Sequence, residues 1–208
     1  MKTKLATSSA PRFHASRGSG ELSDDRAVRS ALLGALESRP EEHPRRLIQE
    51  FWIPVSHERA DVVEVNGLLT GFEIKSGRDS LARLPRQVAA FSAVFDHMSL
   101  VCDRRHLVAA EDVIPSWWGL VRAEGAEGTV ILQRVREPAR NPAPEVEMRL
   151  RLLWKAELAA ALRALGLRPG RLDRGQMRQT LMDHASTTEL DSTVRLALLR
   201  RPSSARRW

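Results

Sequence analysis

Two acidic residues and a lysine form the pattern in this sequence that is best suited to catalysis. Asp61 lies in one run of extended character, and Glu73 and Lys75 lie in the next. Side chains alternate between the two faces of a strand, so Glu73 and Lys75 project on one face and Ile74 on the other. Between the runs stands Asn66-Gly67, a strong hairpin signal because both residues tolerate positive φ. A hairpin would therefore bring the three polar residues together.

The register of this hairpin decides whether the site can form. With a two-residue loop, Asp61 would fall opposite Phe72 and face away from Glu73. A three-residue loop over 66–68, with its glycine in the left-handed conformation, would place Asp61 directly opposite Glu73. A bulge at Gly71 would have the same effect. The site can form only with one of these two features, the three-residue loop or the bulge.

Hydrolysis of a phosphodiester needs a hard cation, an activated water and positive charge near the phosphate oxygens. Asp61 and Glu73 would hold Mg²⁺ or Mn²⁺, with the backbone carbonyl of Ile74 as a further ligand. Lys75 would sit beside the attacking water and oppose the developing charge. Only four of the 33 Lys and Arg residues are lysines, so a lysine in mid-strand is unlike the ordinary surface charge of this chain. The alternative is a solvent-facing strand with an exposed ion pair, which is worth little energetically.

Composition indicates a folded protein rather than a disordered or membrane-spanning one. Hydrophobic residues make up 42% and charged residues 28% of the 208 residues. No window approaches the roughly 20 apolar residues of a membrane span, and the N-terminus opens without the apolar stretch of a signal peptide. We expect a cytoplasmic protein with no membrane partner. Its single cysteine, Cys102, lies in an apolar run and is expected to be a buried, inert thiol.

The net charge of +7 lies at the two ends of the chain. Residues 1–20 and 200–208 carry eight basic residues and no acid, so the body between them is close to neutral. Basic ends add salt-sensitive attraction to phosphate, but a nucleic-acid groove on the body has to come from a local arrangement.

Periodicity predicts an α/β fold with a mixed sheet flanked by helices. We expect a basic arm over 1–20, a core over 21–135, a linker over 136–147, a helical subdomain over 148–200 and a basic tail over 201–208. Within the core, the patterns predict helices ending near residue 40, starting near residue 80 and at 107–112, and strands at 46–55, 60–65, 68–76, 98–102, 117–121 and 129–135. In the subdomain they predict one long helix over 148–165 and two shorter ones over 172–184 and 187–200. Packing of these helices on the core is favoured over a role as a sequence reader.

The residues around the candidate site resemble a known superfamily, the PD-(D/E)XK nucleases, in its RecB-like branch. The likeness rests on Arg59-Ala60-Asp61, then 71–76 (GFEIKS), 79–87 (DSLARLPRQ) and 115–119 (PSWWG), a combination that looks like a small bacterial family within that superfamily. It implies a restriction-endonuclease-like fold with a C-terminal helical subdomain. No proline precedes Asp61, and Ala60 stands there, as in many members.

The resemblance also implies roles for residues outside the hairpin. Gln87 on the following helix corresponds to a glutamine that contacts the active site, and Glu50 matches an acidic residue that serves as another metal ligand. For nucleic-acid contacts we considered His57 and Arg59, which precede the Asp-bearing strand, and Arg83 and Arg86 on the helix that carries Gln87.

We therefore expect a nuclease dependent on Mg²⁺ or Mn²⁺ that acts on DNA in repair, mobile-element biology or defence. Two alternatives stay open: a non-catalytic nucleic-acid-binding or interaction module of the same fold, and an RNase. A single site that cuts both strands would favour a homodimer. Any motor would be a separate partner protein, because the chain has no Gly-rich loop followed by Lys-Ser or Lys-Thr.

Overall fold

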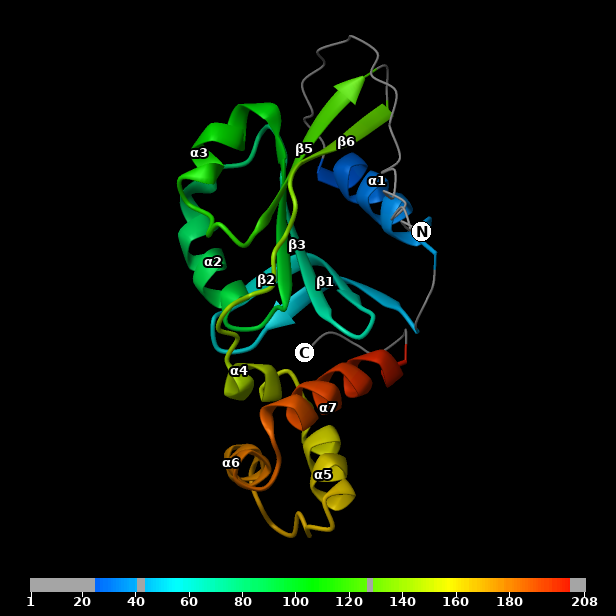
Figure 1. The fold of residues 1–208 in the computed structure, drawn as a ribbon, viewed down its shortest axis with the longest axis vertical. Coiled ribbons are helices and arrows are strands. Elements are labelled where there is room, and N and C mark those ends of the chain that lie inside the picture. The colour runs from blue at the N-terminus through cyan, green and yellow to red at the C-terminus, as the bar shows by residue number, and fades with distance from the viewer. Residues whose placement is uncertain (1–24, 41–43, 127–128, 203–208) are drawn as a thin grey trace, which may run out of the picture.

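A six-stranded mixed sheet in the order β1-β2-β3-β4-β5-β6 forms the centre of the computed structural model (Figure 1). The structure describes residues 25–40, 44–126 and 129–202. The strands are β1 (Arg46–Ile53), β2 (Glu58–Val65), β3 (Leu69–Lys75), β4 (His97–Asp103), β5 (Gly119–Ala126) and β6 (Thr129–Arg136). The middle strands β3, β4 and β5 run parallel, and the outer pairings are antiparallel. This is the mixed sheet that the sequence predicted.

Helices cover both faces of the sheet, as the change from strand to helix period predicted. The helix α1 (Asp25–Glu37) lies on one side, while α2 (Leu84–Ser92) and α3 (Leu107–Glu111) lie on the other (Figure 1). The last two are the crossovers that parallel strands need, since a tight turn cannot join parallel neighbours. Two apolar clusters result, one beneath α1 around Phe72 and Val101, and a larger one on the opposite face around Phe91 and Trp118.

The hairpin between β2 and β3 has the three-residue loop that the site requires. Val65 pairs with Leu69, the Asn66 N–H donates to the Leu68 carbonyl at 3.2 Å, and Gly67 has a φ of 95°. Glycine meets this positive φ without the steric cost of a Cβ. Of the two alternatives that would place Asp61 opposite Glu73, the structure has the three-residue loop, and the ladder runs on without a bulge at Gly71.

The C-terminal region is helical, with one correction to the prediction. In place of one long helix over 148–165 there are two, α4 (Val146–Leu150) and α5 (Lys155–Ala164). The chain breaks at Trp154, whose extended backbone forms the N-cap of α5 and donates its N–H to Glu157 Oε2 at 2.7 Å. Leu152 and Leu153 are buried at this break, so the apolar positions belong to a turn between two helices. The helices α6 (Arg174–His184) and α7 (Thr187–Arg200) match the two shorter predictions.

Smaller boundary differences have local causes. The strand predicted from residue 117 begins at Gly119, because the Trp118 N–H closes a turn on the Pro115 carbonyl at 3.0 Å. The helix expected from about residue 80 begins at Leu84 after a 3₁₀ turn, Leu81–Arg83, which Ser80 caps. The predicted arm over 1–20 and residues 203–208 of the predicted tail lie outside the described residues.

The segment between β6 and α4, predicted as a linker, has no helix or strand over 137–145 and packs against the core. The side chain of the buried Asn141 donates to the Phe95 carbonyl at 2.8 Å, and its N–H donates to the Asp96 carbonyl at 2.8 Å. Among the described residues, no helix is both long and apolar enough to cross a bilayer.

Candidate active site

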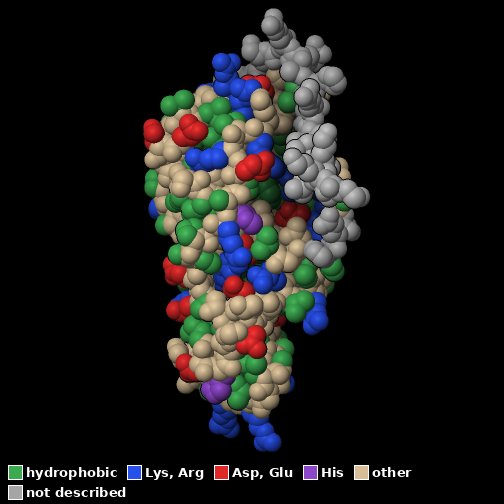
Figure 2. Space-filling model, in the orientation of Figure 1, with side chains coloured by type: hydrophobic (Ala, Val, Ile, Leu, Met, Phe, Trp, Pro, Cys, Tyr) green, Lys and Arg blue, Asp and Glu red, His purple; other side chains and the backbone are tan. Residues whose placement is uncertain are grey.

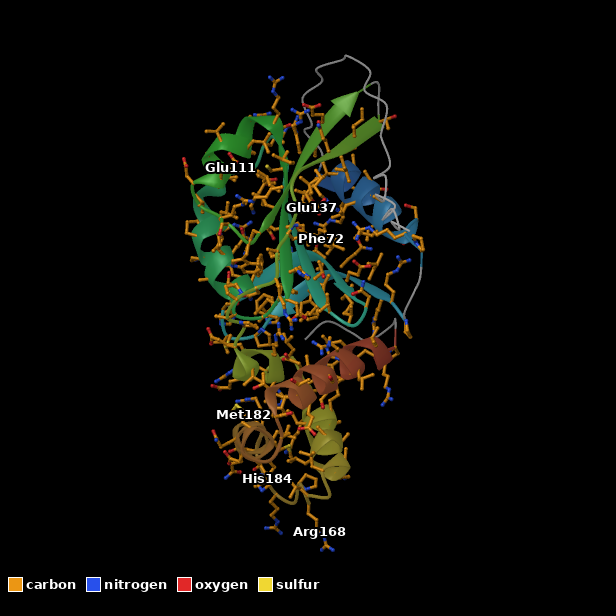
Figure 3. All side chains as sticks on the ribbon, viewed as in Figure 1. Phe72, Glu111, Glu137, Arg168, Met182 and His184 are labelled. Atoms are coloured by element: carbon orange, nitrogen blue, oxygen red, sulfur yellow. The ribbon has the colours of Figure 1, made fainter. Side chains whose placement is uncertain are left out.

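Three predicted acidic residues occupy one row across three neighbouring strands. The residues on either side of Glu50 in β1 pair with those on either side of Asp61 in β2, which sets Glu50 opposite Asp61. The last pair of the ladder between β2 and β3 is Val62 with Phe72. Asp61 and Glu73 occupy the next positions beyond that pair. Phe72 is labelled near the middle of the sheet in Figure 3. The row Glu50, Asp61, Glu73 therefore lies where the hairpin ladder ends.

Asp61 lies at the point where β2 and β3 part. Its Oδ2 accepts the Ile74 N–H at 2.7 Å, a bond from β3 to a side chain of β2 beyond the end of the backbone ladder. Its Oδ1 lies 2.8 Å from Nη2 of Arg29 in α1. Burial raises the pKa of the Asp61 carboxyl, while the Ile74 N–H and Arg29 act in the opposite direction. The carboxylate is thus fixed by two partners from different elements.

Glu73, Lys75 and Gln87 form a buried polar group between β3 and α2, each with only 3% of its surface exposed. The Glu73 Oε1 accepts from Lys75 Nζ at 2.6 Å and from Gln87 Nε2 at 2.6 Å. Lys75 thus lies on the same face as Glu73, as the strand alternation predicted, and Gln87 contacts Glu73, as the resemblance implied; their catalytic roles stay predictions.

Two oxygens of this group are left without a hydrogen-bond partner, Glu73 Oε2 and Gln87 Oε1. Burial, followed by the charge of Asp61, raises the pKa of Glu73 to about 7, against the opposing influence of Lys75 and Gln87. A buried acceptor without a partner costs about 1–3 kcal/mol. Such orphaned oxygens beside a second carboxylate are the kind of group that a cation would satisfy.

Glu50 differs from the other two acids in its backbone. It has a φ of 56°, in the left-handed region that residues other than glycine, Asn and Asp enter at a cost. Its carboxylate hydrogen-bonds to Arg29 Nη1 and lies 2.5 Å from Arg59 Nε. Two arginines thus neutralise the residue that the resemblance assigns to the metal.

Arg29 is the residue of this site that sequence reasoning missed. Its guanidinium contacts three carboxylates: Glu50, Asp61 at 2.8 Å and Asp25 at 3.0 Å. In the sequence, Arg29 directly follows Val28 of the apolar stripe on α1 and reads as solvent-facing. The spacing of Asp25 and Arg29, four apart on a helix, is a local signal for that pair alone.

Within the described residues, no group of three or more His, Cys, Asp and Glu side chains converges in a way that could hold a metal ion. The carboxylates of Glu50 and Asp61 are instead both bonded to the guanidinium of Arg29. Asp61 and Glu73 remain close enough for the charge of Asp61 to raise the pKa of Glu73. The hard-oxygen donors of these two acids fit Mg²⁺ or Mn²⁺, whereas Glu50 can join them only after Arg29 leaves.

The residues considered for nucleic-acid contacts spread around this site. His57 is exposed, has a φ of 56° and meets Trp52 edge-on at 5.5 Å between ring centroids. Arg83 is exposed, and Arg86 is 73% exposed while its Nη2 lies 2.9 Å from Oε1 of the buried Glu58. Arg59 is held at Glu50, as described above.

A second contact that the sequence did not reveal fixes the loop after β3. His106 Nε2 lies 3.1 Å from the Ser76 carbonyl oxygen. The Ser76 hydroxyl and N–H both donate to Asp79 Oδ2 at 2.7 Å. Because Ser76 directly follows Lys75, these bonds fix the chain beside the buried polar group.

Comparison with known proteins relates the chain to a phage protein. The model of the family described as bacteriophage P4 protein cII matches residues 19–206. The chain belongs to this family. Protein cII of Enterobacteria phage P4 is 27% identical over 147 residues, which cover 71% of this chain and 56% of that relative. The match to this member of the P4 cII family thus spans about half of the relative's length.

Among solved structures, a protein of unknown function from Silicibacter pomeroyi is similar to 68% of this chain and 86% of its own, with a TM-score of 0.40 and 19% identity. A likeness of that size supports no argument about the P4 cII family.

Proposed function

We propose that this chain is a metal-dependent nuclease that hydrolyses phosphodiester bonds, with DNA as its substrate and Mg²⁺ or Mn²⁺ as its cofactor. The observation that carries the proposal is the buried carboxylate of Glu73, which has one oxygen bonded to Lys75 and Gln87 and the other left without a partner beside Asp61. The resemblance to PD-(D/E)XK nucleases supports the same reading of these residues.

Each residue has a distinct task in the proposed reaction. Asp61 and Glu73 would hold the ion, Gln87 fixes the orientation of the Glu73 carboxylate, and Lys75 opposes negative charge at the phosphate. A bound divalent cation would supply Lewis acidity and a water of lowered pKa. The Ile74 carbonyl and Glu50 complete the proposed ligand set, with Glu50 joining when Arg29 releases it.

The relation to a phage protein supports a mobile-element setting among those considered. A cytoplasmic location, a homodimer for cleavage of both strands and a separate motor partner belong to the same proposal. An RNase would use the same residues on a different substrate.

One observation favours a second candidate, a non-catalytic nucleic-acid-binding module of this fold. In the described residues Arg29 ties Glu50 to Asp61, and no three-ligand metal group is formed. A permanently bound Arg29 would make the acidic row a structural ion-pair cluster.

The test compares cleavage of labelled single-stranded DNA, double-stranded DNA and RNA with Mg²⁺, with Mn²⁺ and with EDTA. The variants are Asp61→Asn and Lys75→Met, and the matched controls are the exposed Glu111→Gln and Lys155→Met. Binding of Mn²⁺, followed by calorimetry, gives a readout that does not depend on activity. Glu111 is labelled on α3 in Figure 3.

Metal-dependent cutting that is lost in both site variants and kept in both controls would support the nuclease. Cutting of RNA alone would select the RNase. No cutting of any substrate, together with no Mn²⁺ binding that depends on Asp61, would reject the nuclease in favour of the binding module.

A further inference from the structure

The end of the helical subdomain farthest from the sheet carries an unbalanced cluster of arginines. Residues 163–178 contain five arginines and a single acid, Asp173. They lie in the last turn of α5, in the connection to α6 and in the first half of α6. Figure 3 labels Arg168 at this extremity, and Figure 2 shows basic side chains projecting there. We call this surface the arginine tip; it consists of Arg163, Arg168, Arg171, Arg174 and Arg178.

The single acid of the tip is already occupied. Asp173 caps α6, and its Oδ1 accepts the Gln176 N–H at 2.9 Å. Four of the five arginines, all but Arg178, are exposed, and within the described part of the chain none of these four forms an ion pair. The tip is therefore a local excess of positive charge on a protein whose body is close to neutral overall.

The inner border of the tip brings like charges together. Arg178 of α6 lies near Arg151, and burial followed by the charge of Arg151 lowers the pKa of Arg178. The Nε atoms of both arginines are buried without a hydrogen-bond partner. Arg151 has one acidic partner, Glu147, at 2.6 Å from its Nη2. The charges of Glu147 and Asp173 act on Arg178 in the opposite direction, so this border is a mixed cluster, and the outward excess of positive charge belongs to the four exposed arginines.

The amino-acid composition of the tip indicates which kind of anion it could bind. Guanidinium groups match phosphate oxygens with paired N–H donors, which makes arginine the preferred residue for nucleic-acid backbones. Residues 163–178 contain no aromatic side chain for stacking on unpaired bases. Leu165 is the one exposed large hydrophobic residue within 163–178. The tip therefore also lacks the apolar centre of a protein interface.

We propose that the arginine tip binds the phosphate backbone of duplex nucleic acid independently of sequence, at a surface separate from the acidic row. The inference rests on the proposed function for its choice of nucleic acid as ligand, and it does not depend on cleavage. The tip would hold a duplex by phosphate contacts alone, and the helical subdomain would thereby contribute affinity without reading bases.

The test measures binding of the full chain to a fluorescent duplex of arbitrary sequence by anisotropy, in EDTA so that no metal-dependent cleavage occurs. The variant is Arg168→Gln with Arg171→Gln. The matched control is Arg134→Gln with Arg140→Gln, two exposed arginines on β6 and the segment after it. The titration is repeated at several salt concentrations, because each phosphate contact contributes about 0.9 to the slope of log K against log salt.

We expect the tip variant to bind about tenfold more weakly near 0.1 M salt and to lose about 1.8 from the salt slope, with the control close to wild type. Equal behaviour of the two variants would overturn the proposal and leave the tip a solvated surface. Capture of polyglutamate without duplex binding would overturn it in favour of an acidic protein partner. Tip-dependent duplex binding without any cleavage in Mg²⁺ would uphold this inference while the proposed nuclease function fails.

Discussion

Arg29 of α1 and Asp61 of β2 stand 32 residues apart in the sequence, yet Nη2 of the first lies 2.8 Å from Oδ1 of the second. The same guanidinium bonds Glu50. It therefore supplies a positive charge between two acids that the proposed function assigns to a metal. A divalent cation and Arg29 would compete for these oxygens, since each neutralises the same pair of carboxylates.

Replacing Arg29 with alanine should destabilise the protein in EDTA and should increase the stabilisation that Mn²⁺ provides. Two largely buried carboxylates each lose one partner, at a cost of about 1–3 kcal/mol, while Glu50 keeps Arg59 and Asp61 keeps the Ile74 N–H. In Mn²⁺ the melting temperature of Arg29→Ala should rise by more than that of the wild type, because the ion no longer competes with a guanidinium. Thermal unfolding with and without Mn²⁺ measures both effects, with Arg26→Ala on the same helix as control. A rise equal to that of the wild type would rule out the competition.

The buried pair Lys75 and Glu73 should show strong coupling in a double-mutant cycle. Lys75→Met leaves the Glu73 carboxylate buried without its cation and should cost about 3–5 kcal/mol of unfolding free energy. The double variant Glu73→Gln with Lys75→Met removes both charges and should recover a large part of that loss. Urea unfolding of the four proteins measures the coupling. Additive losses in the double variant would show that the two charges act separately.

The hairpin was predictable because its determinants are local. Asn66-Gly67 signals the turn, and the alternation of polar and apolar residues places Glu73 and Lys75 on one face. The loop length, by contrast, stayed open until the structure showed Val65 paired with Leu69. The break between α4 and α5 at Trp154 was not predictable, because the apolar spacing of three and four residues continues across it. The role of Arg29 was not predictable either, because its partners Glu50 and Asp61 lie on other elements. No short-range sequence pattern indicates how α1 packs on the sheet.

Two glycines should respond to alanine in opposite directions. A Cβ on Gly71 of β3 would lie 2.5 Å from Met98 Sδ and 3.0 Å from the Phe95 ring, both fully buried. Gly71→Ala should therefore cost about 1–3 kcal/mol through overpacking. Apart from the backbone of its own helix, nothing lies within 4 Å of a Cβ built on the exposed Gly34 of α1, so Gly34→Ala should stabilise by about 0.5–1 kcal/mol. Chemical denaturation of both variants checks the pair, and a stabilised Gly71→Ala would contradict the packing of β3 on Met98.

Cys102 should be inert in the native protein. Burial, followed by the charge of Asp103, raises the pKa of its thiol to about 12 from an ordinary value of 9.0. A thiol-specific reagent at pH 8 should therefore label the folded chain slowly and the unfolded chain at once. Above pH 9 the thiol of the unfolded chain loses its proton, while the thiol of the folded chain keeps it. The free energy of unfolding should then fall as the pH rises from 9 towards 12, and Cys102→Ala should lack that contribution.

A buried ion-pair network joins the helical subdomain to the sheet. Arg149 of α4 places Nη2 at 2.8 Å from Asp96 Oδ1 and Nη1 at 2.8 Å from Asp191 Oδ1 of α7, and its Nε donates to the Val94 carbonyl at 2.7 Å. The other oxygen of Asp96 accepts the Leu69 N–H at the start of β3 at 2.8 Å. One arginine thus links α4 and α7 to the turn that precedes β4.

Loss of this arginine should weaken the subdomain and the sheet together. Arg149→Met removes the closer of the two cations of the buried Asp96, leaving Arg195 Nη1 at 3.7 Å from its Oδ2, and should cost about 3–5 kcal/mol, measured by urea unfolding. The neighbouring Arg151→Met removes only a partly exposed pair with Glu147 and should cost less than about 0.5 kcal/mol. Because the network spans both parts, hydrogen exchange in Arg149→Met should speed up in α7 as well as in α4. Faster exchange confined to α4 would show that the other contacts of α7, among them Arg195 with Asp96 and Arg46 with the Leu198 carbonyl, hold it without Arg149.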